Sequence, residues 1–233
     1  MIVFKALSAL LAYPVEAMLD ALPEIAAAIE RPSALRARDR RALRELIDEL
    51  EAGDAIDLQE RYVALFDRGR ATSLHLFEHV HGESRERGTA MVDLKEVYAR
   101  AGLQLAGSEL PDYLPALLEF VSLRPREEGL EMLRDCAHIL RGIGDALHAR
   151  ESRYGAVFAA LLSLAGEAGL NRKKSDERIP PEKDLDEEWV DEPVIFGPAA
   201  ACGEAKPQVA QIRFHPRGRN ADTQIPSPLV GEG

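Results

Sequence analysis

Residues 66–88 read FDRGRATSLHLFEHVHGESRERG, and the helices predicted on either side of this stretch must pack around it. This stretch carries three of the chain's six histidines, at positions 75, 79 and 81, among charged residues of both signs. Thr72 or Ser73 can cap a helix, and Gly82 can end one. The pattern therefore predicts a short helix over about residues 73–81.

This predicted helix has two unlike faces. One side of its helical wheel carries the apolar residues Leu76, Phe77 and Val80. The opposite side carries the polar residues His75, Glu78 and His79. We expect the apolar side to enter a core, and we expect His75 and Glu78 to reach solvent or a groove.

Helical patterns continue outward in both directions from this stretch. Ala and Leu dominate the composition and β-branched residues are scarce, which favours helix over sheet. Apolar residues recur at helical spacing in segments covering about residues 2–12, 15–31, 33–52, 58–66, 84–102, 114–123, 130–147 and 154–165. Pro14 and Pro23 are expected in first turns, and Asp57 with Glu60 has the spacing of a capping box. The sequence predicts an all-α, single-domain helical bundle.

The composition changes after residue 170. Residues 1–170 are expected to form the helical domain, and the acidic segment 171–233, with its Pro and Gly residues, is expected to be a flexible, mostly disordered tail. Within this tail, Trp189 to Phe196 is the one apolar island. Two roles stay open for it, docking back onto the domain or acting as a short linear motif.

The charge and the cysteine content argue against several classes of protein. The formal net charge is −11, and this argues against nucleic acid as a partner, because phosphate binding requires clustered Lys and Arg. Only Cys136 and Cys202 are present, too few for a disulfide framework. The apolar run at residues 2–12 lacks a basic segment before it, and no segment approaches the ~18 apolar residues of a membrane span. We therefore expect a cytoplasmic protein without stable membrane insertion.

His75-Leu76-Phe77-Glu78-His79 fits H-x-x-E-H, in which two histidines bind zinc and the glutamate activates water. A zinc-dependent hydrolase is therefore one hypothesis, with Glu151 or Glu167 as the candidate third ligand. Against it, such proteases use an α/β scaffold whose strands are not predicted here. The simpler interpretation is a solvated helix face with local ion pairs. We expect no catalytic and no metal-binding residue.

Residues 65–120, LFDRGRATSLHLFEHVHGESRERGTAMVDLKEVYARAGLQLAGSELPDYLPALLEF, closely resemble the signature region of the nitrate reductase molybdenum cofactor assembly chaperones, the NarJ family. Residues 151–165 and the tail portion 187–203 resemble that family as well. The family is related to the TorD-type redox enzyme maturation chaperones, which are all-helical and are not enzymes. His75 is not among its signature positions.

The resemblance implies a chaperone that binds the apo catalytic (alpha) subunit of respiratory nitrate reductase at or near its N-terminal segment. It would act in nitrate assimilation by unfolded protein binding, support molybdenum cofactor insertion and delay membrane attachment. It would hold no cofactor of its own, although it could assist delivery of the molybdenum guanine dinucleotide cofactor together with molybdenum cofactor biosynthesis proteins. The alternative is a helical adaptor for an unrelated client.

The family's signature, together with the neighbouring aromatic residues, supplies the candidate client-binding residues. Phe66, Phe77 and Tyr113 are the expected apolar anchors, bordered by charge. The full candidate set is Tyr62, Phe66, Asp67, Arg68, Phe77, Glu78, His79, His81, Glu83, Arg87 and Tyr113.

Overall fold

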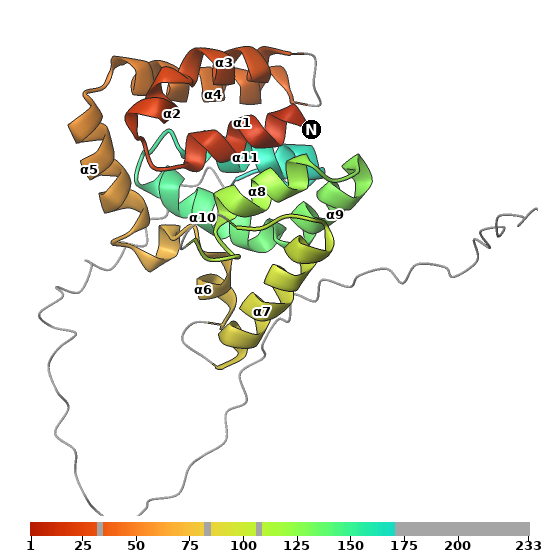
Figure 1. Ribbon diagram of the computed structural model, residues 1–233. Coiled ribbons are helices and arrows are strands. Elements are labelled where there is room, and N and C mark those ends of the chain that lie inside the picture. The colour runs from red at the N-terminus through yellow and green to blue at the C-terminus, as the bar shows by residue number, and fades with distance from the viewer. Residues whose placement is uncertain (32–34, 82–84, 106–108, 171–233) are drawn as a thin grey trace, which may run out of the picture.

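The computed structural model describes residues 1–31, 35–81, 85–105 and 109–170 (Figure 1), and the structural statements below concern these ranges. Helices make up almost all of the regular structure in this part of the chain. In order they are α1 (Ile2–Leu11), α2 (Glu16–Asp20), α3 (Leu22–Glu30), α4 (Ala37–Ala52), α5 (Ala55–Phe66), the 3₁₀ helix η1 (Arg70–Thr72), α6 (Leu76–His81), α7 (Arg85–Arg100), α8 (Leu114–Ser122), α9 (Arg126–Asp135), α10 (Ala137–Ala149) and α11 (Gly155–Ala165).

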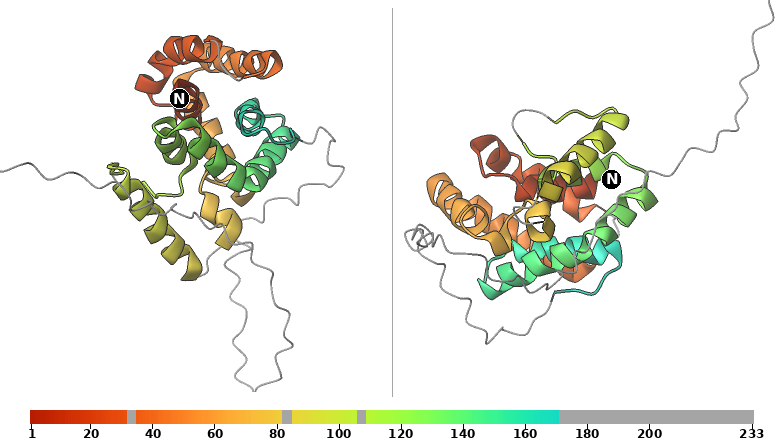
Figure 2. Two further views of the ribbon diagram at one scale, coloured as in Figure 1. Left: turned by 90° about the vertical axis from the view of Figure 1, so that its right-hand side faces the viewer. Right: turned by 90° about the horizontal axis from the view of Figure 1, so that it is seen from below.

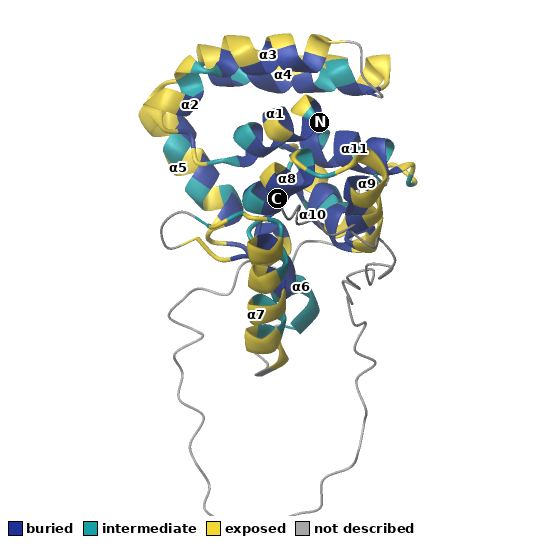
Figure 3. Ribbon diagram, turned by 45° about the vertical axis from the view of Figure 1, so that its right-hand side comes forward, coloured by how far each residue is buried: buried dark blue, intermediate teal, exposed yellow. Residues whose placement is uncertain are grey.

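The core lies between two pairs of closely packed helices. Helix α1 packs along α8, and α10 packs along α11, as Figure 2 also shows for the second pair. Leu7, Leu118 and Phe158 are completely buried there. Helices α3 and α4 cover one end, while α6 and α7 project from the opposite end (Figure 1). The buried faces of α1, α8, α10 and α11 turn inward, whereas α7 is largely exposed along its length (Figure 3).

The all-helical prediction is confirmed. The only β pairing among the described residues is an isolated antiparallel bridge between His75 and Tyr113. The helical stripes predicted from spacing enter the core, including Leu43, Leu46, Ile47 and Leu50 of α4. Gly102 and Gly166 follow α7 and α11 with φ of 78° and 79°, the left-handed conformation that ends helices.

Three local predictions differ from the structure. The side chain of Asp54, not Asp57, caps α5 by accepting hydrogen bonds from the backbone N–H groups of Ile56 and Asp57. The predicted capping box fails because Asp57 already lies inside the first turn of α5. Pro14 precedes α2 by two residues, while Pro23 does occupy the first turn of α3. Helix α6 begins at Leu76 rather than near Ser73, because Leu74 to Leu76 first pair with residues 112–114.

The predicted tail, residues 171–233, lies outside the described residues, as do Gly82, Glu83 and Ser84. The division into a domain at 1–170 and a tail therefore stays a prediction, although α11 ends at Ala165, close to the proposed boundary. None of the helices in the described ranges combines the length and the apolar character needed to cross a membrane.

Candidate functional site

Asp112 is the centre of the histidine-rich region, and its side chain is completely buried. Its Oδ2 accepts a hydrogen bond from the backbone N–H of Phe77 at 3.1 Å, and its Oδ1 lies 3.3 Å from Nδ1 of His75. The first N–H groups of a helix have no partner within the helix. Asp112 therefore caps α6 from a position 35 residues further along the chain.

Backbone hydrogen bonds fix the same junction. The N–H of Leu76 donates to the carbonyl of Asp112 at 3.1 Å, and the N–H of Leu114 donates to the carbonyl of Leu74 at 2.9 Å. These two bonds form the bridge between His75 and Tyr113. The start of α6 and the start of α8 are consequently held together as one unit.

A second chain of polar contacts runs from the start of α6 to α7. Ser73 Oγ donates to Glu78 Oε2 at 2.6 Å and accepts from the backbone N–H of His75 at 3.2 Å. The other oxygen of Glu78, Oε1, accepts a hydrogen bond from Arg87 of α7 at 3.1 Å. Ser73, His75, Glu78 and Asp112 are called the Asp112 cluster below. Its polar groups are satisfied internally rather than by solvent alone.

The other two histidines also contact protein groups. His79 Nε2 lies 2.9 Å from the carbonyl of Ser73, so this nitrogen carries the proton in the bond. His81 packs its ring edge-on against Phe77, with 5.7 Å between ring centroids, and its Nδ1 lies 3.7 Å from Glu86. The predicted exposure is found for Leu76 and Phe77, which are buried, and for His75 and Glu78, which are partly exposed. Val80, expected in the core, is half-buried and packs against the edge of the core.

The aromatic residues proposed as anchors differ in accessibility. Tyr62, Phe66 and Phe77 are buried, each 3–4% exposed, whereas Tyr113 is half-buried. The hydroxyl of Tyr62 donates to the carbonyl of Leu11 at 2.7 Å and lies 3.1 Å from the hydroxyl of Tyr113. Burial raises the pKa of Tyr62 and of Tyr113, so both remain neutral hydrogen-bonding groups. Tyr113 is the anchor candidate that a ligand can reach directly.

The remaining candidates lie around this junction. Asp67 and Arg68 follow α5 and are exposed, and Arg87 is half-buried against Glu78. Glu83 lies outside the described residues. Contacts join these candidates to one another: Tyr113 lies beside Tyr62 of α5 and pairs with His75, and Arg87 of α7 binds Glu78 of α6. Helices α6 and α7 project from the same end of the bundle (Figure 1).

Two buried residues complete this region. Thr72 Oγ1 donates to the carbonyl of Leu65 and accepts at 3.3 Å from Arg150, the residue directly after α10, which ties η1 to the body of the bundle. Tyr154 packs edge-on against Phe66, with 5.1 Å between ring centroids. These contacts hold the end of α5 in place beneath the exposed Asp67 and Arg68.

His75 gives the site a pH dependence. Its hydrogen bond to Asp112 raises the pKa of His75 above 6.5, opposed by partial burial and by Arg87 and assisted by Glu78. Since the folded pKa exceeds the unfolded one, this interaction stabilises the fold fully below pH 6.5 and is lost as the pH rises through the folded pKa. We predict that the unfolding free-energy difference between wild type and His75→Gln is largest below pH 6.5 and shrinks as the pH rises through the raised pKa of His75. Denaturant unfolding across pH measures it, and a pH-independent difference would contradict the assignment.

With this geometry described, the chain can be compared with known proteins. The model of the nitrate reductase delta subunit family matches residues 32–160. The chain is also 43% identical over 220 residues to the nitrate reductase molybdenum cofactor assembly chaperone NarJ of Escherichia coli K12, covering 92% of this chain and 93% of that one. The chain belongs to the nitrate reductase delta subunit family.

Two further relatives bear similar names. The probable nitrate reductase molybdenum cofactor assembly chaperone NarW of Escherichia coli K12 is 39% identical over 219 residues, covering 91% of this chain and 92% of that one. The probable chaperone NarJ of Bacillus subtilis is 31% identical over 169 residues, covering 72% of this chain and 91% of that one. The similarity to these delta subunit family relatives therefore extends over most of each chain.

In this family member the H-x-x-E-H pattern does not adopt the geometry of a zinc protease. His75 lies before α6 and pairs with Asp112, whereas His79 lies within α6 and contacts Ser73, so the two histidines do not face one ion from a single helix. The described residues contain no group of three His, Cys, Asp or Glu side chains that could hold a metal ion. Nothing in the geometry favours the hydrolase hypothesis.

Sequence reasoning missed Asp112 as the organising residue of this family member's site. A signal was available, because Pro111-Asp112-Tyr113 lies just before a predicted helix and Asp prefers such positions. The position of Asp112 would have predicted a cap for α8, but Asp112 caps α6 instead. The residue at the N-cap of α8 is Tyr113, whose side chain forms no capping hydrogen bond. Thr72, Arg150 and Tyr154 were not proposed either, since their contacts connect segments far apart in the sequence.

Proposed function

We propose that this protein is a dedicated chaperone that binds the apo catalytic (alpha) subunit of a respiratory nitrate reductase. It keeps that subunit competent for insertion of the molybdenum guanine dinucleotide cofactor. The observation that carries this proposal is the 43% identity to a nitrate reductase molybdenum cofactor assembly chaperone over 92% of this chain and 93% of that one. A similarity of that extent includes the helices that build the Asp112 cluster.

The finer parts of the proposal follow from the same role. The protein acts in the cytoplasm without catalysing a reaction, binds the N-terminal segment of its client and delays membrane attachment until the cofactor is in place. Cys136 also supports a protein that catalyses no reaction through this thiol. Burial raises the pKa of the Cys136 thiol to about 12, so the thiol stays protonated and is not a nucleophile. Proteins of molybdenum cofactor biosynthesis are proposed as additional, transient partners.

The surface beside the Asp112 cluster is the proposed client site. Asp67 and Arg68 are exposed there, and Tyr113 offers a half-buried ring with a hydroxyl. A peptide segment placed here would meet an aromatic anchor bordered by both charges, an arrangement common at interfaces. Tyr62, Phe66 and Phe77, which are buried, would support this surface from beneath rather than contact the client directly.

Arg68 gives a direct test of this surface. We expect Arg68→Ala to weaken binding of a peptide from the client's N-terminus by about 1 kcal/mol, since a charged donor at the border of the site would be lost. The melting temperature of the Arg68→Ala variant should equal that of the wild type, because Arg68 is exposed. Arg126→Ala, an equally exposed arginine on α9, is the matched control. Calorimetric titration measures both, and equal weakening by the two variants would contradict the placement.

A gene deletion tests the function itself. In cells lacking this protein we expect the catalytic subunit to be synthesised but to contain little molybdenum and to reduce little nitrate. Complementation with the wild-type chain should restore both molybdenum content and activity. A deletion strain with fully loaded, active nitrate reductase would contradict the proposal and would favour a helical adaptor for another client.

A further inference from the structure

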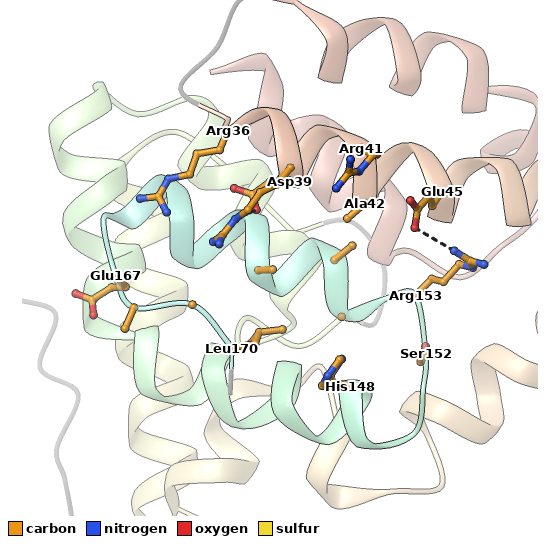
Figure 4. A pocket seen from close by; sticks show the side chains of 16 residues that line it. Arg36, Asp39, Arg41, Ala42, Glu45, His148, Ser152, Arg153, Glu167 and Leu170 are labelled. Carbon is orange, nitrogen blue, oxygen red and sulfur yellow. Dashed lines mark hydrogen bonds and ion pairs between the residues drawn. The ribbon is translucent and has the colours of Figure 1, made fainter. Parts of the chain in front are cut away.

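A cavity of about 760 Å³ lies between α4, α11 and residues 166–170, and His148 of α10 also lines it (Figure 4). None of its lining residues belongs to the candidate client site. Small residues of α11, Gly155, Ala156 and Ala159, leave the space open along one wall. The volume falls in the range of sites that hold a drug-sized group.

The segment after α11 forms a fixed wall of this cavity. Arg134 donates to the carbonyl of Ala165 at 3.0 Å, and Arg141 donates to the carbonyl of Ala168 at 3.0 Å. The side chain of Leu170 packs directly over Gly144 of α10, where an added Cβ would come within 2.5 Å of it. The described part of the chain thus ends while it is still lining the cavity.

Asp39 of α4 gives the cavity an unsatisfied acceptor. Its side chain is only 4% exposed, and its Oδ1 accepts a hydrogen bond from Nε of Arg38 at 3.1 Å. Its Oδ2 is buried and has no hydrogen-bond partner in the part of the chain that the structure describes. Buried carboxylate oxygens are almost always paired, and a small rotation of the Asp39 side chain would let this atom accept from an N–H or O–H donor in the cavity that its residue lines.

The arginines around Asp39 indicate which charge an occupant of the cavity should carry. Arg153 is paired with Glu45 and Glu49, and Glu167 is paired with Arg141. Arg36 and Arg41 form no ion pair or side-chain hydrogen bond with any described residue. The cavity therefore presents positive charge in a chain whose net charge is −11, and its occupant should be acidic as well as a donor.

We propose that the cavity receives residues 187–192 of this same chain, Glu-Glu-Trp-Val-Asp-Glu, with the Trp189 indole inside. The indole Nε1–H is a donor without acceptor capacity, which suits Asp39 Oδ2. The acidic residues on both sides of Trp189 suit Arg36 and Arg41. Val190 and the indole ring bring apolar surface to the alanine and glycine wall.

The chain can reach this position easily. From Leu170 to Trp189 there are 189 − 170 = 19 residues, which span up to ~60 Å when extended. The entropic cost of closing such a loop grows only slowly with its length. A bound water could satisfy Asp39 Oδ2 alone, whereas the acidic segment would also place carboxylates beside the exposed Arg36 and Arg41.

Trp189 is the chain's single tryptophan, so its fluorescence reports on the proposed contact in the full-length protein. We expect its emission to be blue-shifted, and its quenching by acrylamide to be weaker, than in a synthetic peptide of residues 182–196. The double variant Arg36→Glu/Arg41→Glu should move both readings toward those of the peptide. So should Ala159→Leu, which fills the cavity without changing charge.

The matched control is Lys5→Glu/Arg126→Glu, which changes the net charge equally at exposed positions outside the cavity and should leave Trp189 protected. Circular dichroism melts confirm that each variant is folded. The proposal is overturned if wild-type Trp189 is as accessible as in the peptide, or if the cavity variants and the control behave alike. Protection that disappears on dilution would instead indicate docking onto a second copy and would also overturn it.

Discussion

Asp112→Ala is expected to reduce the free energy of unfolding by about 3 kcal/mol, since it removes two interactions of a completely buried carboxylate. The backbone N–H of Phe77 would lose its acceptor inside the protein, and His75 would lose its partner. The start of α6 would then keep the two backbone hydrogen bonds of the bridge and the contact between the His75 and Tyr113 rings. Chemical denaturation of the full-length protein measures the loss.

Asp112→Asn is the control for this prediction. Its side-chain oxygen can still accept from Phe77, while the charge beside His75 is gone. We therefore expect a smaller loss, and we expect the pH dependence attributed to His75 to become weaker, since Glu78 remains beside it. If Asp112→Ala were as stable as wild type, Asp112 would not be the residue that holds α6.

Phe77→Ala is expected to cost about 4 kcal/mol, because a buried aromatic ring in contact with His81 is replaced by a cavity. Phe77→Leu should cost much less, since it keeps most of the apolar volume. Thermal or denaturant unfolding measures both variants. A Phe77→Ala protein with wild-type stability would show that this ring lies outside the core.

The variants Phe77→Ala and Phe77→Leu also distinguish a ring that supports the client surface from beneath from a ring that contacts the client directly. If Phe77 acts from beneath the client surface, Phe77→Leu should bind the client peptide nearly as well as wild type. A large loss of peptide binding by a fully stable Phe77→Leu protein would instead assign Phe77 to the interface. Unfolding curves must therefore accompany each titration.

Helix positions were largely predictable because apolar spacing records which face of a helix is buried. The stripe in α4 and the two unlike faces of α6 both correspond to buried and at least partly exposed side chains, and Gly102 and Gly166 end their helices in the left-handed conformation that glycine favours. These features depend on residues a few positions apart, and local sequence contains that information.

The organisation of the candidate site was not predictable in the same way. Helix α6 is capped by Asp112, which is distant in sequence, and Thr72 is hydrogen-bonded to Arg150, which follows α10. Nor does a helical wheel distinguish an aromatic ring at a surface from one in a core, so Tyr62 and Phe66 were expected as accessible residues and are buried. Such contacts depend on the tertiary fold rather than on local spacing.

Titration of the purified protein with the catalytic subunit of its nitrate reductase tests the central claim most directly. The subunit should be prepared both without and with the molybdenum cofactor. The account predicts clear, saturable binding of the cofactor-free subunit and much weaker binding of the loaded one. Equal affinity for both forms, or no binding to the cofactor-free form, would contradict it.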